Sequence, residues 1–239
     1  MLLIIQTFMY KYFISLSFVL ISVFGFAQGE NEISTDSIIY KKTYGLRAGI
    51  DAASLIRTGI DPEYTGFQIL ADYRLTDRLY VAGEIGNESL DRTSESVDYE
   101  STGQFLKAGV DYNFYQNWLD MDNMIYGGAR LGFANFSQTL NRYDYNTDNN
   151  YFPIFTNVVD REFSGLNMVW IEIQLGIKVE VLNNFFVIAN LQLKHRLTEN
   201  APENFDNLYA PGFGRTYDRG NIGAGYSYGI MYRIPFFKK

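Results

Sequence analysis

The chain has 239 residues, of which 17% are aromatic and 20% are charged, and its formal net charge is -7. We expect no nucleic-acid partner, because binding phosphate needs clustered lysines and arginines and the sequence contains no basic run. The lack of cysteine excludes disulfides, thiolate metal sites and a lipid-modified cysteine, and a single histidine, His195, excludes a histidine-rich metal cluster. We therefore predict no cofactor.

The first 27 residues have the features of a secretory signal peptide. An apolar run over 13–26 follows Lys11 and ends in Gly25-Phe26-Ala27, a small-x-small cleavage pattern. We predict cleavage directly after this motif, with either Met1 or Met9 as the start of the precursor. The alternative is a retained anchor, since the whole stretch is long enough to span a membrane.

From residue 43 onwards, stretches of alternating apolar and polar residues recur along the chain, and no segment keeps a helical period. The clearest stretch is 169–181, where valine, isoleucine and leucine occupy one phase and mostly polar residues occupy the other. Successive side chains of a strand point to opposite faces, so each stretch predicts a strand with one apolar face. The eight predicted strands are 43–51, 66–75, 79–87, 104–114, 124–136, 169–181, 185–197 and 221–236.

Short and long connections alternate between the predicted strands. The short ones are centred on 76–78, 116–118 and 182–184, and the long ones cover 52–65, 88–103, 137–168 and 198–220. This asymmetry is typical of outer-membrane barrels, in which the long loops face outside. We therefore predict that residues 43–239 form an all-β, eight-stranded antiparallel up-and-down transmembrane β-barrel, after a periplasmic N-terminal segment over 28–42. Closure pairs every strand edge, as hydrocarbon requires.

The polar phase of the predicted strands carries acids and bases in nearly equal numbers, together with many glycines. Buried charges are tolerable only in pairs, and a narrow eight-stranded lumen needs small residues between long ones. We therefore predict that this phase faces the lumen and that the apolar phase faces lipid; the alternative is an ordinary solvated sheet face. The predicted interior charge network consists of Arg47, Asp72, Arg74, Glu84, Lys107, Asp111, Arg130, Glu172, Lys178, Glu180, Lys194, Arg196 and Arg233.

Aromatic side chains gather near both ends of the predicted strands, as they do at the two interfaces of a membrane. Core packing is an alternative reason for aromatic residues at such positions. The end of the chain, YRIPFF over 232–237, is similar to the aromatic last strand that barrel-assembly machinery recognises, although Lys238 and Lys239 follow it. We therefore expect outer-membrane lipid and this machinery as partners.

Four stretches carry a resemblance to a known family: YGLRAGID from Tyr44, NWLDMDNMIYGGARLGF from Asn117, EFSGLN from Glu162 and NFDNLYAPGFGRTYD from Asn204. From Tyr44 to its end, the chain resembles an uncharacterised family of Bacteroidota outer-membrane β-barrel proteins, which are small barrels of the OmpA and OmpX type. The resemblance implies an eight-stranded barrel and an outer-membrane location. It implies no activity and no catalytic residues.

The last long connection contains aromatic residues interspersed with charged ones, a combination that often anchors binding surfaces. It is our candidate site for recognition of an external protein or glycan. The alternative is that its aromatic rings pack onto the barrel rim. The candidate recognition residues are Phe205, Asp206, Tyr209, Phe213, Arg215 and Tyr217.

Two chemical alternatives depend on few residues. Acyl-transfer or hydrolytic chemistry would use His195 as its base, but Lys194 and Arg196 flank it, disfavour its protonation and offer no orienting carboxylate. A histidine at the rim is the simpler interpretation. The acids of the third long connection match no spaced calcium loop, so we predict no metal site.

The predicted function is that of a non-enzymatic outer-membrane protein with a plugged polar interior. It would act in envelope structure or in partner binding through its long external loops. A transport pore is disfavoured, because eight strands leave a lumen that side chains just fill. Two other classes stay open: a soluble secreted barrel of lipocalin type, with the apolar phase around a ligand, and an outer-membrane enzyme that uses His195.

Overall fold

The computed structural model describes residues 43–115, 122–145, 153–202, 205–217 and 220–238. The predicted signal peptide over 1–27 and the predicted periplasmic segment over 28–42 lie outside these residues. Within the described ranges, no helix has both the length and the apolar character to cross a membrane.

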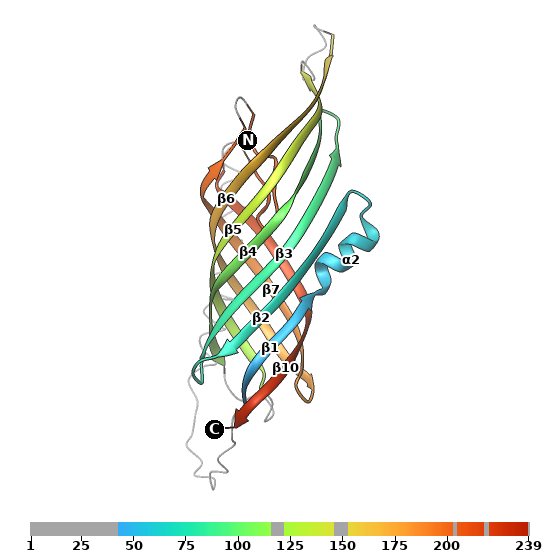
Figure 1. The fold of residues 1–239 in the computed structure, drawn as a ribbon. Coiled ribbons are helices and arrows are strands. Elements are labelled where there is room, and N and C mark those ends of the chain that lie inside the picture. Colours follow the sequence, from blue (N-terminus) through green and yellow to red (C-terminus); the bar gives the residue numbers. More distant parts are fainter. Residues whose placement is uncertain (1–42, 116–121, 146–152, 203–204, 218–219, 239) are drawn as a thin grey trace, which may run out of the picture. The chain divides into compact units, whose positions relative to one another are not determined.

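Eight long antiparallel strands form a closed barrel (Figure 1). Their order is β1-β10-β7-β6-β5-β4-β3-β2, so each strand pairs with its neighbours along the chain and the last long strand closes onto the first. The predicted eight-stranded antiparallel up-and-down barrel is confirmed. The barrel strands are β1 (Thr43–Asp51), β2 (Tyr64–Arg74), β3 (Leu79–Thr93), β4 (Val97–Tyr115), β5 (Met124–Tyr145), β6 (Phe155–Leu182), β7 (Phe185–Asn200) and β10 (Ile222–Lys238).

The two ends of the barrel differ in their connections. At one end, here called the turn end, β2 joins β3 through 75–78 and β6 joins β7 through 183–184, close to the start of β1 and the end of β10 (Figure 1). Asn184 has a φ of 64°, the left-handed conformation that two-residue hairpin turns favour. These two connections are short, as predicted, whereas the predicted turn over 116–118 lies outside the described residues. We call the opposite end the loop end.

The predicted loop over 88–103 is wrong, because β3 and β4 continue through it as a paired hairpin. Their register runs without interruption to Thr93 opposite Asp98 and leaves only 94–96 as a turn. One face of this extension buries Leu90 and Tyr99, whereas the opposite face carries polar residues such as Asp91 and Glu100. The prediction depended on an apolar outer phase, which this polar outer face lacks.

The predicted loop over 137–168 is also largely strand. β5 and β6 stay paired up to Tyr145 opposite Phe155, far beyond the predicted strand ends. Register shifts between Phe136 and Gln138 and again before Arg142 interrupt the regular pairing. Such bulges place two residues opposite one and so break the two-residue period of the side chains.

The predicted connection over 52–65 contains a helix that periodicity did not indicate, α2 (Ala52–Ile60). Asp51 caps its first turn, since its carboxylate accepts from the backbone N–H groups of Ala53 at 3.3 Å and Ser54 at 3.2 Å. The helix has only nine residues, which is too short for a helical period to stand out. The sequence signal was the capping aspartate before Ala-Ala-Ser-Leu-Ile.

The two phases of the strands face opposite environments. On β6, Glu172 is 1% exposed and lies inside the barrel, whereas its neighbour Ile173 is 64% exposed on the outer surface. The same alternation runs around the wall, with apolar side chains outside and polar ones inside. Smaller groups of buried apolar residues lie in the interior on both sides of the charged centre, towards the loop end and towards the turn end.

Candidate functional site

Charged side chains from six strands form one chain of alternating charge through the lumen. Arg47 Nε lies 2.6 Å from Asp72 Oδ1, and Lys178 Nζ lies 2.6 Å from Asp72 Oδ2 and 3.0 Å from Asp111 Oδ2. Arg130 Nη2 lies 2.7 Å from Asp111 Oδ1. All of these residues are buried, so each charge has an opposite charge in place of water.

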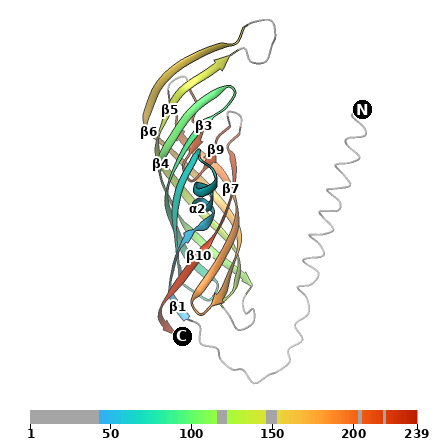
Figure 2. The same ribbon diagram turned by 90° about the vertical axis from the view of Figure 1, so that its right-hand side faces the viewer.

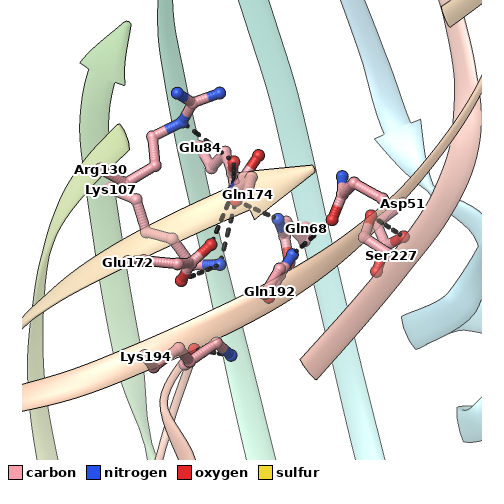
Figure 3. Close-up of polar contacts among 12 residues, drawn as sticks. Asp51, Gln68, Glu84, Lys107, Arg130, Glu172, Gln174, Gln192, Lys194 and Ser227 are labelled. Carbon is pink, nitrogen blue, oxygen red and sulfur yellow. Dashed lines mark hydrogen bonds and ion pairs between the residues drawn. The ribbon is translucent and has the colours of Figure 1, made fainter. Parts of the chain in front are cut away.

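The chain of charges continues towards the loop end. Arg130 Nε lies 3.4 Å from Glu84 Oε1, and Lys107 Nζ lies 3.0 Å from Glu84 Oε2 and 3.4 Å from Glu172 Oε2 (Figure 3). Four cations therefore meet four carboxylates along the whole chain. Such a neutral network tolerates burial, whereas removal of a single member would leave an uncompensated charge.

Two glutamines complete the central network and were missing from the sequence prediction. Gln68 Nε2 donates to Glu84 Oε2 at 2.9 Å. Gln174 Nε2 donates to Glu172 Oε1 at 2.6 Å and lies 3.0 Å from Glu84 Oε1. Both residues stand on the predicted interior phase of their strands, and that position was the available signal.

Three predicted network residues form a separate cluster at the turn end. Arg233 forms ion pairs with Asp122 and with Glu180, the latter at 3.0 Å, and Arg74 Nη2 lies 3.0 Å from Asp122 Oδ1. Asp122 was not predicted, because it precedes the first residue of β5 and belongs to no alternating stretch. The structure therefore divides the predicted interior network into a central part and a turn-end part.

Arg196 lies on the inward phase of β7, opposite the buried Trp170, but at the rim and apart from the central network. It forms an ion pair with Glu199 and donates from Nη2 to Asn221 Oδ1 at 2.8 Å, at the partly exposed rim. A register shift between Val169 and Trp170 of β6 interrupts its pairing with β7 beside Arg196. Arg196 is the last residue of the regular register before this shift, which explains its position at the rim.

Lys194 lies inside the loop end of the barrel, where it contacts a loop that folds back into the mouth. We call residues 205–217 the inserted loop. It contains the short strands β8 (Tyr209–Ala210) and β9 (Gly214–Arg215), joined by a turn that Phe213 N closes by donating to Ala210 O at 3.1 Å. Lys194 Nζ donates to Gly212 O at 2.8 Å and lies 3.3 Å from Phe213 O.

The turn of the inserted loop requires glycine. Pro211 and Gly212 occupy its two central positions, and Gly212 has a φ of +74°, which is the pattern of a type II turn. A β-carbon at Gly212 would also lie 2.5 Å from the ring of Phe105 on β4. The loop tip therefore fits against the barrel wall only without a side chain at this position.

Polar contacts from the wall hold the inserted loop. Glu88 Oε2 accepts from Tyr209 Oη at 2.6 Å and from Gly212 N at 3.0 Å, and Ser101 Oγ donates to Tyr209 O at 2.9 Å. Burial raises the pKa of the Tyr209 phenol well above its ordinary value, and the nearby Glu88 carboxylate raises it further. Tyr209 therefore acts as a neutral donor.

Apolar contacts hold the other side of the loop. The Phe213 ring packs edge-on against Trp170 with 5.9 Å between ring centroids. Phe213 and Ala210 belong to one buried cluster with residues of three wall strands. The wall members of this cluster are Phe105, Ala134, Phe136, Leu166, Met168 and Trp170.

The candidate recognition residues divide into two groups. Tyr209 and Phe213 are buried in the barrel mouth, as the packing alternative requires, so they are not available as surface contacts. Asp206, Arg215 and Tyr217 are exposed, and Phe205 is half-buried. The sequence pattern located the loop but could not tell which of its aromatic rings turn inwards.

The described part of the chain gives little support to the two chemical alternatives, catalysis at His195 and metal binding. His195 is exposed on the outer face of β7, between Ile171 of β6 and Ile222 of β10. In the described residues, no three acids or histidines lie close enough together to hold a metal ion.

Fold and site together define the class: a closed eight-stranded antiparallel barrel with an ion-paired lumen, an apolar outer surface and a loop inserted into one mouth. The chain belongs to the family described as a domain of unknown function, DUF6048, whose model matches residues 9–239. No curated protein matches the sequence.

Solved structures show similar folds at low identity. The N-terminal β-barrel domain of OprF from Pseudomonas aeruginosa has 13% identity and a TM-score of 0.41, over 82% of this chain and 100% of that one. The attachment invasion locus protein Ail of Yersinia pestis has 10% identity and a TM-score of 0.39 over the same shares. A major outer membrane protein of Thermus thermophilus has 16% identity and a TM-score of 0.40, over 80% and 98%.

Proposed function

We propose that this protein is a non-enzymatic barrel of the outer membrane with a filled interior. The observation that carries the proposal is the reversed polarity of the wall. Leu191 and Ile173 are 67% and 64% exposed on the outside, whereas Lys178 and Glu172 are 3% and 1% exposed inside. A continuous apolar belt of this kind is unfavourable in water and is matched by the hydrocarbon of a bilayer.

The soluble alternative of lipocalin type requires the opposite arrangement. Its apolar phase would line a ligand cavity and its polar phase would face water. In this barrel the lumen contains paired ions, and the aliphatic side chains point outwards. The polarity of the wall therefore supports a lipid environment over a secreted carrier.

The proposed role is in envelope structure or in binding an external partner at the loop end, which would face outside the cell. Two paired ribbons, β3 with β4 and β5 with β6, project there. The exposed part of the inserted loop adds Asp206, Arg215 and Tyr217 as candidate contacts for an external protein or glycan. The outward position of His195 between two isoleucines gives no support to a catalytic role.

Lipid-confined labelling tests the proposed orientation of the wall. A photoactivatable reagent dissolved in the bilayer should modify Ile173 and Leu175 in the reconstituted full-length protein and should leave Glu172 and Lys178 unmodified. Heat-modifiable migration on a gel would show that the labelled protein is a closed barrel. Labelling of Glu172 or Lys178 in place of the isoleucine and leucine, or solubility without detergent, would refute the proposal.

A further inference from the structure

The barrel wall is incomplete on one side of its loop half. β1 ends at Asp51, opposite Gly229 of β10, and its pairing with β2 reaches only to Ile50 opposite Ile69. Beyond these points, 64–68 of β2 and 222–228 of β10 have no strand between them among the described residues. Each of them still pairs with its other neighbour, β3 or β7. We call the opening between 64–68 and 222–228 the seam.

Helix α2 covers the seam. It packs against both β2 and β10, and Figure 2 shows it in front of the wall. Thr58 Oγ1 accepts from Gly66 N at 2.8 Å and lies 3.2 Å from Gly66 O. One hydroxyl thus contacts both backbone groups of Gly66 at the unpaired edge of β2. The Arg57 guanidinium stacks 3.8 Å from the centre of the Tyr64 ring. The seam is therefore closed by side-chain contacts of α2 and not by the backbone hydrogen bonds of a paired strand.

The polarity of α2 is also reversed. Its buried and half-buried residues are two small alanines, Ala52 and Ala53, and the polar Ser54, Arg57 and Thr58. Leu55, Ile56 and Ile60 are 39%, 48% and 78% exposed. A helix on the rim of a soluble protein buries its apolar side. An apolar side that points away from the barrel suits the boundary between lipid head groups and acyl chains.

A cavity with a mixed polar and apolar lining lies behind the helix and the seam. Its volume is about 950 Å³, within the range of small-molecule sites. Its lining includes Arg57 of α2, Gln68 of β2, Lys194 of β7, Gly225 of β10 and Arg215 of the inserted loop. The cavity is thus bounded by the lumen, the inserted loop and the seam.

The cavity has a preference for negative charge, because cations outnumber acids in its lining: Arg57, Arg92, Lys107, Lys194 and Arg215 against Asp51 and Glu88. Lys194 is the innermost of these that contacts the inserted loop. The residue is 6% exposed, and its ammonium group contacts the backbone oxygens of Gly212 and Phe213. Among the described residues it forms no ion pair. A buried ammonium group without a counterion is costly, and an anionic group in the cavity would supply one.

We propose that the seam admits a single-chain amphiphile with an anionic head group. The head group enters the cavity near Lys194, and the acyl chain leaves through the seam, past the Ser54 and Thr58 side of α2, to the outer surface that carries Ile56 and Ile60. This inference rests on the proposed membrane location, since the acyl chain needs the outer leaflet as its surroundings.

Filling the cavity tests the site directly. A β-carbon at Gly225 would lie 2.9 Å from Lys194 Nζ and 2.9 Å from Gln192 Oε1, which are flexible side-chain ends. Gly225→Trp therefore begins its side chain against movable groups and not against backbone, and its ring is directed at the space that the head group would occupy. The matched control is Leu193→Trp, which adds the same ring on the outer face, where Leu193 is 56% exposed.

Native mass spectrometry of the full chain in neutral detergent measures the bound probe, lysophosphatidylglycerol. We expect one molecule per barrel in the unsubstituted protein and in Leu193→Trp, and at least a tenfold lower occupancy in Gly225→Trp. Equal occupancy in both variants overturns the site. Displacement by glycerol phosphate alone would assign the site to a free anion, and equal retention of uncharged monoolein would overturn the role of Lys194.

A second variant tests the route. Ile56→Glu with Ile60→Glu should slow uptake of lysophosphatidylglycerol from vesicles at least fivefold and leave occupancy in detergent unchanged. Equal uptake rates would overturn entry through the seam. Heat-modifiable migration is recorded for every variant. A closed, membrane-inserted barrel that binds no probe overturns only this inference, whereas a barrel that fails to insert overturns the proposed function as well.

Discussion

Lys178 shows how one side chain joins strands that are distant in the sequence. Its ammonium group lies 2.6 Å from Asp72 and 3.0 Å from Asp111, on β2 and β4, while Lys178 itself belongs to β6. Removing one member of a buried pair leaves the other charges uncompensated, which usually costs about 3 to 5 kcal/mol. The central network therefore depends on each of its members.

We expect Lys178→Met to lower the free energy of unfolding by about 3 to 5 kcal/mol, because two buried carboxylates lose their shared cation. Urea unfolding in detergent or lipid, followed by gel migration, measures the change. Ile177→Met alters the adjacent outward position and should change stability by less than about 0.5 kcal/mol. Equal stability of the two variants would contradict a stabilising role of the ion network.

The phenol of Tyr209 makes the inserted loop sensitive to alkaline pH. Burial and Glu88 raise the pKa of this phenol. Tyr209 therefore stays neutral in the docked loop at pH values where it would be ionised in a released loop. Docking is thus fully stable below pH 10, the ordinary tyrosine value. It should weaken by about 1.4 kcal/mol for each pH unit above that value, up to the raised pKa.

Hydrogen exchange of the amides over 205–217, corrected for intrinsic rates, should show this loss of protection as the pH rises above 10. In Tyr209→Phe the protection should be lower at neutral pH, because the hydrogen bond to Glu88 is lost. It should also be independent of pH over the same interval. An unchanged pH dependence in this variant would assign the effect to another group.

Among the elements, the hairpin of β8 and β9 depends most on one backbone position. Gly212 and Gly214 both have positive φ values, +74° and +103°, but only a side chain at Gly212 would collide with Phe105. Substituting each glycine in turn therefore distinguishes the effect of backbone strain, which both positions share, from the effect of a steric clash, which only Gly212 has.

Gly212→Ala should release the inserted loop, since it adds a clash at 2.5 Å to the strain of a positive φ. Trypsin cleavage after Arg215 should then become at least tenfold faster. Gly214→Ala has strain without a neighbour within 4 Å and should show a smaller acceleration. Equal rates in both variants would mean that strain alone controls the loop.

Length and polarity of the elements follow different causes. β6 has 28 residues because β5 continues to pair with it beyond the apolar belt, whereas β1 has nine and gives way to α2. Inside the belt, lipid on one side and ions on the other impose alternation. Outside it, the outer side needs no apolar residues, whereas the inner side still packs against the inserted loop, as Leu90 and Tyr99 do with Tyr209.

For the whole molecule, the filled lumen predicts an absence of steady conductance. The central ion pairs and the turn-end cluster occupy the lumen independently of the inserted loop. Planar-bilayer recordings should therefore show no steady single-channel currents, either from the complete protein or from a variant with 206–216 replaced by a short glycine-serine link. Steady currents from the complete protein would contradict a filled barrel.

The sequence alone determined the number of barrel strands, because each strand shows its own stretch of alternating residues. It also determined which face is charged, as Glu172 and Ile173 of β6 illustrate. Local periodicity carries this information, because a strand between lipid and a narrow lumen must alternate. Tertiary structure alone decided that Tyr209 and Phe213 turn inwards, that Asp122 joins the turn-end cluster, that Arg196 lies at the rim and that α2 replaces part of the wall. These features arise from contacts between distant residues and from bulges, which no local period records.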